Sequence, residues 1–449
     1  MKASSPKRIS LFVLIVLVAV ATIFLPIFRG RAQAAGPAAS IRILTLNDVK
    51  TIAIDKNKDI QRALEYRHYV EGRYVAERAA ALPQLTAHLG AVKSRDGSQE
   101  GLMGGMFPVR TELRSAEVTL TQAIFTWGQV GAAIRAAKTG MANAEDQLRI
   151  IREATLRDVT TAFYNVLLAK ELNRIAVQNL DQKDRHLKEM TRKLQAGVAT
   201  DYDVLSWDVA MENARPEVIR TENLIRTTLD QLRFLLGMDE GQIDVSGVLD
   251  TTVDAPYPEY DETLKVAREK RPELSEIRNR TRMAEEVVTI ANAGNKPRLD
   301  LRADYGYKDW EQDDALSNGE LWSAGLYITF PFFDGLRTRG QVRQAKSEAA
   351  SLRIEESKLQ DEIALQVRDA INAVREAGEI LKALSSTVTQ ADRLLVMAEK
   401  GYEYGVKIKL DVDDAIFNLN SAKANLAKAR RDYLAALVNL EWVKGVLVH

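Results

Sequence analysis

The sequence predicts an α+β membrane protein built from two copies of one unit, in which a helix leads into a β-hairpin and then into a long helical hairpin. Three observations predict this fold class. One passage recurs at a constant offset of 208 positions, the stretch 298–309 alternates between apolar and ionic residues, and apolar residues repeat every three or four positions over unusual lengths.

The recurring passage is clearest from Tyr402 to Gly445. Pairs separated by 208 positions are Gly197 and Gly405, Val198 and Val406, Asp203 and Asp411, Val204 and Val412, and Gly237 and Gly445. In the second copy, mostly small apolar residues follow a four-three spacing: Ala415, Leu419, Ala422, Leu426, Ala429, Tyr433, Ala436 and Leu440. This spacing predicts a coiled-coil seam, and the first copy matches it more loosely, starting at Trp207.

Composition excludes several classes of function. The 62 basic and 62 acidic residues leave no net charge, so a nucleic-acid partner is not indicated. Cysteine is absent, which excludes disulfides, thiolate metal sites and cysteine nucleophiles. The four histidines lie far apart, and no phosphate-binding glycine loop or nucleophile elbow occurs. We therefore expect neither an enzyme nor a metal or cofactor site.

The amino-terminal segment has the composition of an export signal. Lys2, Lys7 and Arg8 precede the apolar run Leu11–Phe28, and Ala32–Ala34 offers a small-residue cleavage site. This order predicts a secretory signal peptide at 1–34, and an uncleaved membrane anchor is the alternative.

The remaining elements follow in the same order in both copies. The first repeat is predicted at 44–237, with its hairpin at 84–126 and long helices at 128–195 and 201–237. A connector follows at 238–260. The second repeat is predicted at 261–445, with its hairpin at 298–333 and long helices at 335–403 and 409–444. The region from Leu44 to about Leu82 is predicted as helix, ended by Pro83. Pro216 is expected to kink the first return helix.

The second hairpin indicates a membrane-facing sheet. Alternate residues such as Leu299, Leu301 and Tyr305 are apolar, whereas those between them, such as Asp300 and Arg302, are ionic. A half-buried strand of a soluble protein would show the same alternation. The export signal and the ionic face favour a lipid-facing wall around a watery interior. Since four strands would leave open edges in lipid, the chain is expected to assemble with further copies.

Longer motifs carry a family resemblance. Gln122–Gly128 (QAIFTWG) and Phe330–Gly335 (FPFFDG) open the long helices, and each Gly-Val turn is followed by Asp-Val. With the duplication, these motifs resemble the TolC-like outer-membrane efflux proteins from about Leu44 to Gly445. The resemblance implies a homotrimer with a twelve-stranded β-barrel in the cell outer membrane, continued by an α-helical coiled-coil tunnel through the periplasm.

The resemblance also implies a function and partners. It describes a passive exit duct of a tripartite efflux pump or type I secretion system, gated at its periplasmic end, which meets a periplasmic adaptor (membrane fusion protein) and an inner-membrane transporter. The sequence leaves the cargo open between drugs, metal ions and polypeptides. The alternative function is an exported coiled-coil structural or adaptor protein that forms no pore.

Site residues follow from the positions that match the family. The implied pore constriction is Asp411 and Asp414 with the additional Asp413, the implied gate network is Tyr402, Lys407 and Asp203, and the implied adaptor-contact tips are Gly197, Val198, Gly405 and Val406. Rings of carboxylates around a narrow passage would favour cations. The alternatives are that the aspartates only cap a helix, that the network is ordinary surface, and that the glycines only end helices.

Overall fold

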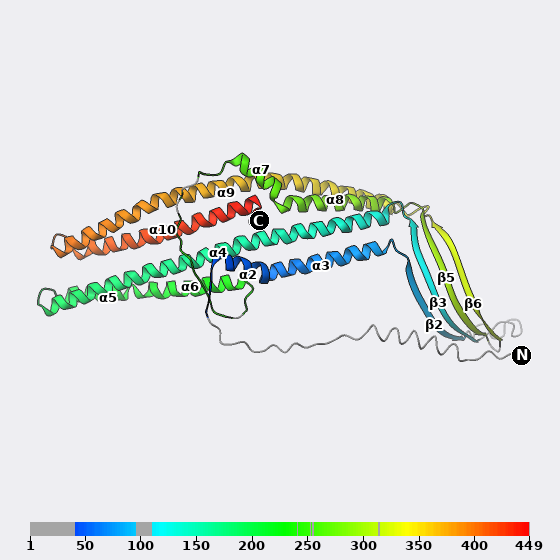
Figure 1. The fold of residues 1–449 in the computed structure, drawn as a ribbon, viewed down its shortest axis with the longest axis horizontal. Helices are drawn as coiled ribbons and strands as arrows, with labels where there is room; N and C mark the ends of the chain where they lie inside the picture. Colours follow the sequence, from blue (N-terminus) through cyan, green and yellow to red (C-terminus); the bar gives the residue numbers. More distant parts are fainter. Residues whose placement is uncertain are drawn as a thin grey trace. The chain divides into compact units, whose positions relative to one another are not determined.

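Two successive units of the same kind make up the described part of the chain (Figure 1). The structure is a computed structural model, and it describes residues 41–95, 110–239, 241–251, 253, 256–312 and 315–448. The predicted signal peptide at 1–34 and the loop between the first two hairpin strands, at 97–108, lie outside these residues.

Each unit contains two helices, a β-hairpin, a 67-residue helix and a return segment. The first unit consists of α2 (Leu46–Lys56), α3 (Lys58–Ala79), β2 (Gln84–Arg95), β3 (Arg110–Phe125), α4 (Gln129–Gln195), α5 (Asp201–Glu212) and α6 (Arg215–Leu235). The second consists of α7 (Tyr260–Lys270), α8 (Pro272–Asn292), β5 (Arg298–Gln312), β6 (Ala315–Thr329), α9 (Arg337–Glu403) and α10 (Lys409–Lys444). The short strands β1 (Arg42–Leu44) and β4 (Ile243–Val245) pair in parallel.

A break at Asn57 divides the entry helix that the sequence predicts as one element. The side-chain oxygen of Asn57 accepts hydrogen bonds from the amides of Asp59 (2.9 Å) and Ile60 (3.1 Å), which makes it the N-cap of α3. Its side-chain amide donates to the carbonyl of Leu235 at 2.8 Å. The single-helix prediction is therefore wrong, because a capping asparagine starts a new helix and fastens it to the end of α6.

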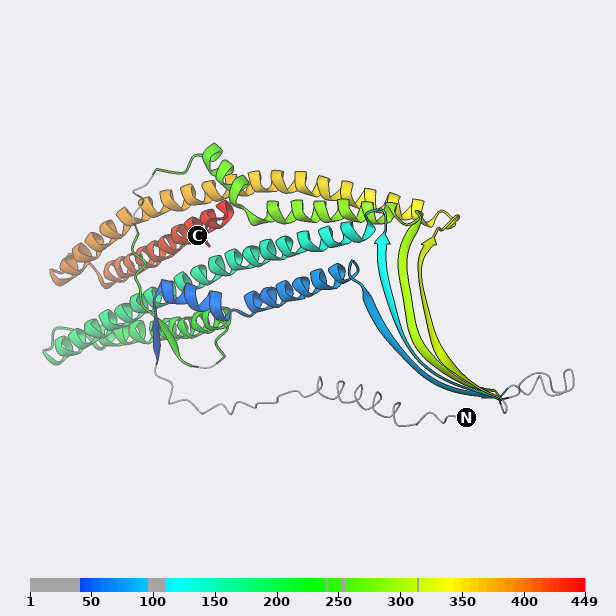
Figure 2. The same cartoon turned by 45° about the vertical axis from the view of Figure 1, so that its right-hand side comes forward.

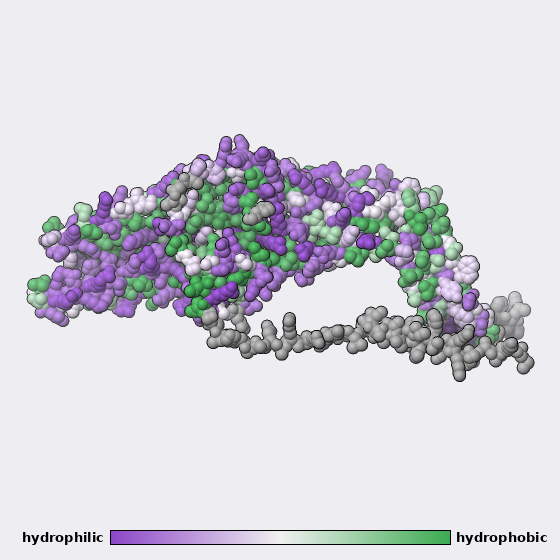
Figure 3. Space-filling view, in the orientation of Figure 1, coloured by the Kyte–Doolittle hydropathy of each residue, from purple (hydrophilic) through white to green (hydrophobic). Residues whose placement is uncertain are grey.

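The two hairpins form one antiparallel sheet in the order β2-β3-β5-β6 (Figure 2). Opposite partners on β5 and β6 are Leu299 and Ile328, Leu301 and Leu326, Ala303 and Ala324, and Tyr305 and Trp322. The sheet thus has one apolar face, and hydrophobic residues gather over the strands where they join the helices (Figure 3). The intervening residues Arg298, Asp300, Arg302 and Asp304 share the other face. Among the described strands, β2 and β6 each leave one edge unpaired.

Each long helix begins at a left-handed turn after a strand. Trp127 (φ 52°) and Gly128 (φ 81°) precede α4, and Gly335 (φ 66°) and Leu336 (φ 67°) precede α9. The indole of Trp127 donates to the carbonyl of Pro297 at 2.7 Å, which links the first unit to the start of β5. At 1.5 Å per residue, helices of this length extend about 100 Å. None of the helices in the described ranges is long and apolar enough to cross a membrane.

The return segments differ between the units. In the second unit α10 is continuous over 36 residues. In the first, two helices replace the single kinked helix that the sequence predicts, because Pro216 lies in the first turn of α6. Proline lacks an amide hydrogen and its ring clashes with the carbonyl four residues earlier, here that of Glu212, so the helix ends there.

The predicted coiled-coil seam of α10 is confirmed. Six of its residues are buried, namely Ala415, Leu419, Ala422, Ala429, Tyr433 and Leu440. Ala415, Leu419 and Ala422 belong to one core cluster, and Leu426 and Ala436 are partly buried against another, which contains Ala429, Tyr433 and Leu440. Residues of α9 at matching spacing, including Ala370, Val374 and Leu381, pack into that cluster. Small side chains thus allow α9 and α10 to lie close along their length.

Candidate pore constriction and gate

The two helical hairpins end in similar turns. Gly197 (φ 75°) and Gly405 (φ 73°) adopt the left-handed conformation that ends a helix, and the following amides of Val198 and Val406 donate back to the carbonyls of Lys193 and Gly401. Both valines are exposed, at 75% and 80%. The implied adaptor-contact tips are therefore good helix ends that also present an apolar side chain, so the two interpretations are compatible.

The three aspartates implied at the constriction differ in their surroundings. Asp411 caps α10 by accepting the amide of Ile408 at 3.1 Å, and Lys407 lies 3.3 Å from its carboxylate. These two bonds lower the pKa of Asp411, so the carboxylate is charged. Asp413 forms an ion pair with Lys409 at 2.7 Å. Asp414 is exposed, and no ion pair to it occurs within the part of the chain that the structure describes.

Asp414 shares the exposed face of α10 with two apolar residues. Leu410 and Phe417 are 61% and 71% exposed, and they lie one turn before and one turn after Asp414. The opposite face, with Val412 and Ala415, is buried against the rest of the protein. The sequence interpretation missed Phe417, although its position outside the seam and three residues after Asp414 is a detectable signal.

The predicted gate residues have separate partners within the chain. The hydroxyl of Tyr402 donates to the sulfur of Met190 at 3.9 Å. Asp203 accepts the hydroxyl and the amide of Thr200 at 2.7 Å and 2.9 Å, and these bonds lower its pKa. Lys407 contacts Asp411, as described above. A single chain therefore does not bring Tyr402 and Asp203 together, and Asp203 acts in it as a helix cap.

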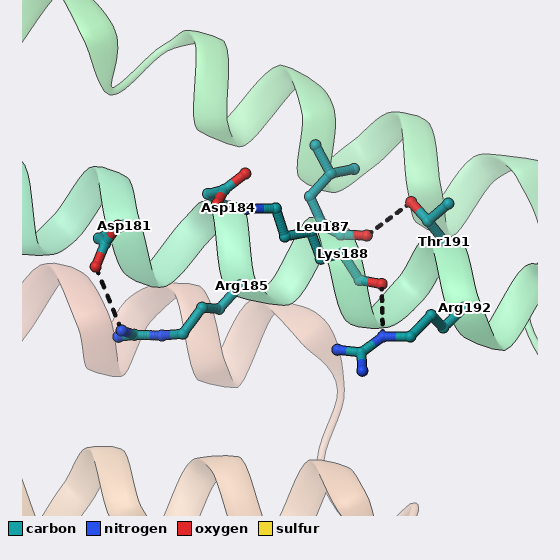
Figure 4. A network of polar contacts seen from close by, with 7 residues as sticks. All are labelled: Asp181, Asp184, Arg185, Leu187, Lys188, Thr191 and Arg192. Carbon is teal, nitrogen blue, oxygen red and sulfur yellow. Dashed lines mark hydrogen bonds and ion pairs between the residues drawn. The ribbon is translucent and has the colours of Figure 1, made fainter.

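Other polar contacts connect the two helical hairpins. Gln182 of α4 donates to Glu399 of α9 at 2.9 Å, and Asn420 of α10 donates to Asn179 of α4 at 2.9 Å. The exposed charges of α4 nearby pair along their own helix instead, as between Asp181 and Arg185 (Figure 4). Pairs four residues apart stabilise the long helix itself.

A cavity of about 720 Å³ lies where the sheet meets the helices. Arg298, Asp300 and Arg302 of β5 line it together with Arg73 and Glu77 of α3. The ionic face of the sheet thus borders a space at the start of the helices, and apolar side chains such as Val70 and Val130 line other parts of it. Among the described residues, no group of three or more His, Cys, Asp or Glu side chains could hold a metal ion.

A sheet with one apolar and one ionic face, joined to helical hairpins of this length, is typical of a channel protein of the outer membrane. The sequence profile of the outer membrane efflux protein family matches residues 51–238 and 263–446, so the chain belongs to this family. The two matches fall one on each unit. The family resemblance drawn from the motifs is thereby confirmed.

Curated relatives and solved structures agree with this assignment. Outer membrane protein TolC of Escherichia coli is 24% identical over 403 residues, covering 87% of this chain and 80% of the relative. Alkaline protease secretion protein AprF of Pseudomonas aeruginosa is 25% identical, covering 90% and 85%. The fold is similar to the Campylobacter jejuni CmeC outer membrane channel, with a TM-score of 0.79, 16% identity and 94% of both chains covered.

Family membership decides between the two functions that the sequence leaves open. The protein is an outer-membrane exit duct for export from the cell, and the prediction of this function and location is confirmed. The alternative of a coiled-coil scaffold without a pore is set aside. The family consists of transport channels rather than enzymes.

Proposed function

We propose that three copies of the chain close their sheets into one twelve-stranded β-barrel and their helical hairpins into a periplasmic tunnel. The observation that carries this proposal is the sheet itself, which has four strands, one apolar face and an unpaired edge on both β2 and β6. In lipid each unpaired backbone group costs several kcal/mol, and a closed barrel needs about eight strands or more. Joining β6 of one copy to β2 of the next removes every edge.

The same closure gives the channel a watery interior. The ionic face of β5, with the charged residues Arg298, Asp300 and Arg302, would then lie inside, and the apolar partners Leu299, Leu301, Ile328 and Leu326 would contact lipid. The duct is passive. Energy and cargo selection come from an inner-membrane transporter, which reaches the duct through a periplasmic adaptor bound at the tips around Gly197–Val198 and Gly405–Val406.

The constriction of this tunnel would lie at the first turns of α10. Of the implied aspartates, Asp414 contributes its full charge to the passage because it is exposed, whereas Lys407 and Lys409 partly neutralise Asp411 and Asp413. Phe417 would add an apolar ring one turn further along the same face. A narrow passage that combines carboxylates with aromatic rings is expected to favour cations and to limit conductance.

Size measurement and electrical recording together test the proposed function. The purified protein in detergent is expected to have the mass of three chains, and in planar lipid bilayers it should form cation-selective channels of low conductance. Protein that stays monomeric in lipid nanodiscs and produces no conductance would contradict the assembly.

The gate network of Tyr402, Lys407 and Asp203 would link the inner helices of the second unit to the neighbouring outer helices. We expect Tyr402→Phe combined with Lys407→Ala to raise single-channel conductance severalfold, because the change removes the hydroxyl that contacts Met190 and the ammonium that pairs with Asp411. The matched control is Tyr404→Phe, since Tyr404 is 77% exposed two residues away. A double variant that conducts like the parent would exclude the network from the gate.

A further inference from the structure

Trp207 occupies a position where the duplication predicts a small residue. The residue 208 positions later is Ala415, a member of the small-residue seam. Trp207 is nevertheless completely buried. Its cluster includes Met190 of α4, Leu395 of α9 and Val412 of α10, which come from both units. The large side chain therefore fills the contact between the two helical hairpins.

Both faces of the indole are covered by polar side chains. The ring of His186 stacks on Trp207 with centroids 4.5 Å apart and an angle of 22° between the planes. The ammonium of Lys409 lies 4.4 Å from the ring centroid. Because the imidazole already covers one face, Lys409 must lie over the other. An ammonium at this distance over an indole is attracted by the negative ring face.

Lys409 connects this stack to the acidic cluster. It is the first residue of α10, two residues before Asp411, and its ammonium also pairs with Asp413 at 2.7 Å. A movement of the first turn of α10 away from α4 and α5 that exceeds the reach of the flexible lysine stem separates this ammonium from the indole. Within the described residues the indole nitrogen of Trp207 has no hydrogen-bond partner, so the ring faces carry its polar contacts.

We propose that Trp207 clamps the first turn of α10, through the ammonium of Lys409, against the helices of the first unit. This inference rests on the proposed function, in which the first turn of α10 forms the constriction. The clamp then holds the acidic residues of that turn in their closed position. Trp207 and Lys409 are thus positioning residues for the closed state. Other charged groups around the stack are Glu399, Glu189 and Arg185, which face His186.

Two measurements test the clamp. Hydrogen exchange of a peptide that covers the first turn of α10 reports its opening, and single-channel conductance in planar bilayers reports the width of the passage. We expect Lys409→Met to accelerate the exchange about tenfold and to raise the conductance, because methionine keeps an unbranched apolar stem but removes the cation. Lys409→Arg should behave like the parent, since a guanidinium also binds an indole face. Trp207→Leu should resemble Lys409→Met.

The control variant Asp413→Asn separates the clamp from the ion pair. It removes the partner of Lys409 but leaves the ammonium over the indole, so exchange is expected to stay near the parent rate. The proposal is overturned if Asp413→Asn opens the turn as much as Lys409→Met, or if Lys409→Met changes nothing. The hydrogen-exchange measurement tests the clamp even if the parent protein forms no channels. A parent without channel activity would contradict the proposed function but not the clamp.

Discussion

Replacing Gly237 with alanine is expected to lower the free energy of unfolding by about 3–5 kcal/mol. Gly237 follows α6 with a φ of 64°, a conformation that costs about 1–2 kcal/mol for a residue with a side chain. The added methyl group would also lie well inside van der Waals contact with the carbonyl oxygen of Lys56. That oxygen belongs to the backbone at the break between α2 and α3, so the joint itself would have to move.

The matched control for this prediction is Gly197→Ala. Gly197 has a similar φ of 75°, but an added methyl group would meet nothing within 4 Å. Its replacement should therefore show the conformational cost alone, about 1–2 kcal/mol. Thermal and denaturant unfolding followed by circular dichroism at 222 nm measures both variants. If both variants lost the same free energy of unfolding, the close approach to the carbonyl of Lys56 would contribute nothing to the cost at Gly237.

The second unit repeats this joint. Gly445 follows α10 with a φ of 70°, and an added methyl group would lie 3.0 Å from the backbone nitrogen and Cα of Arg271. Arg271 separates α7 from α8, as Asn57 separates α2 from α3. Each return segment thus ends in a glycine that packs on the break between its unit's entry helices. The duplicated joint explains why glycine stands at both positions.

Asp414→Asn is expected to reduce the cation-over-anion permeability ratio by roughly threefold or more. The exposed carboxylate of Asp414 occurs once in each proposed subunit, so the substitution removes three charges from the passage. Reversal potentials in planar bilayers under a salt gradient measure the ratio. Asn has nearly the same size as Asp, and the conductance should therefore change less than the selectivity.

Two control variants isolate the role of this carboxylate. Asp413→Asn removes the same number of charges one residue away, but Lys409 already neutralises them, so selectivity should change little. Phe417→Ala should widen the passage and raise the conductance while the selectivity stays cation-favouring. If Asp413→Asn reduced the permeability ratio as much as Asp414→Asn, the placement of the exposed Asp414 as the main charge in the passage would be contradicted.

Local elements and the faces that they bury can be predicted from the amino-acid sequence. The four-three spacing from Ala415 to Leu440 identifies the buried side of α10, and the alternation in β5 identifies the two faces of the sheet, as the structure confirms. Both patterns have a local cause, since the geometry of a helix or strand assigns each side chain to a face. The helix break at Asn57 depends on the hydrogen bonds of its capping side chain, and the break before Pro216 depends on the clash of the proline ring with a carbonyl. The spacing of apolar residues does not predict either of them.

Contacts between residues of different elements follow from the way the elements pack together. This packing placed β3 beside β5, directed Tyr402 to Met190, and neutralised Asp413 with Lys409 while it left Asp414 exposed. It also covered the indole of Trp207 with side chains from α4 and α10. The spacing of apolar residues indicates which face of a helix or strand is buried. The partner of a charged or aromatic side chain depends instead on which helix, distant in the sequence, packs beside it.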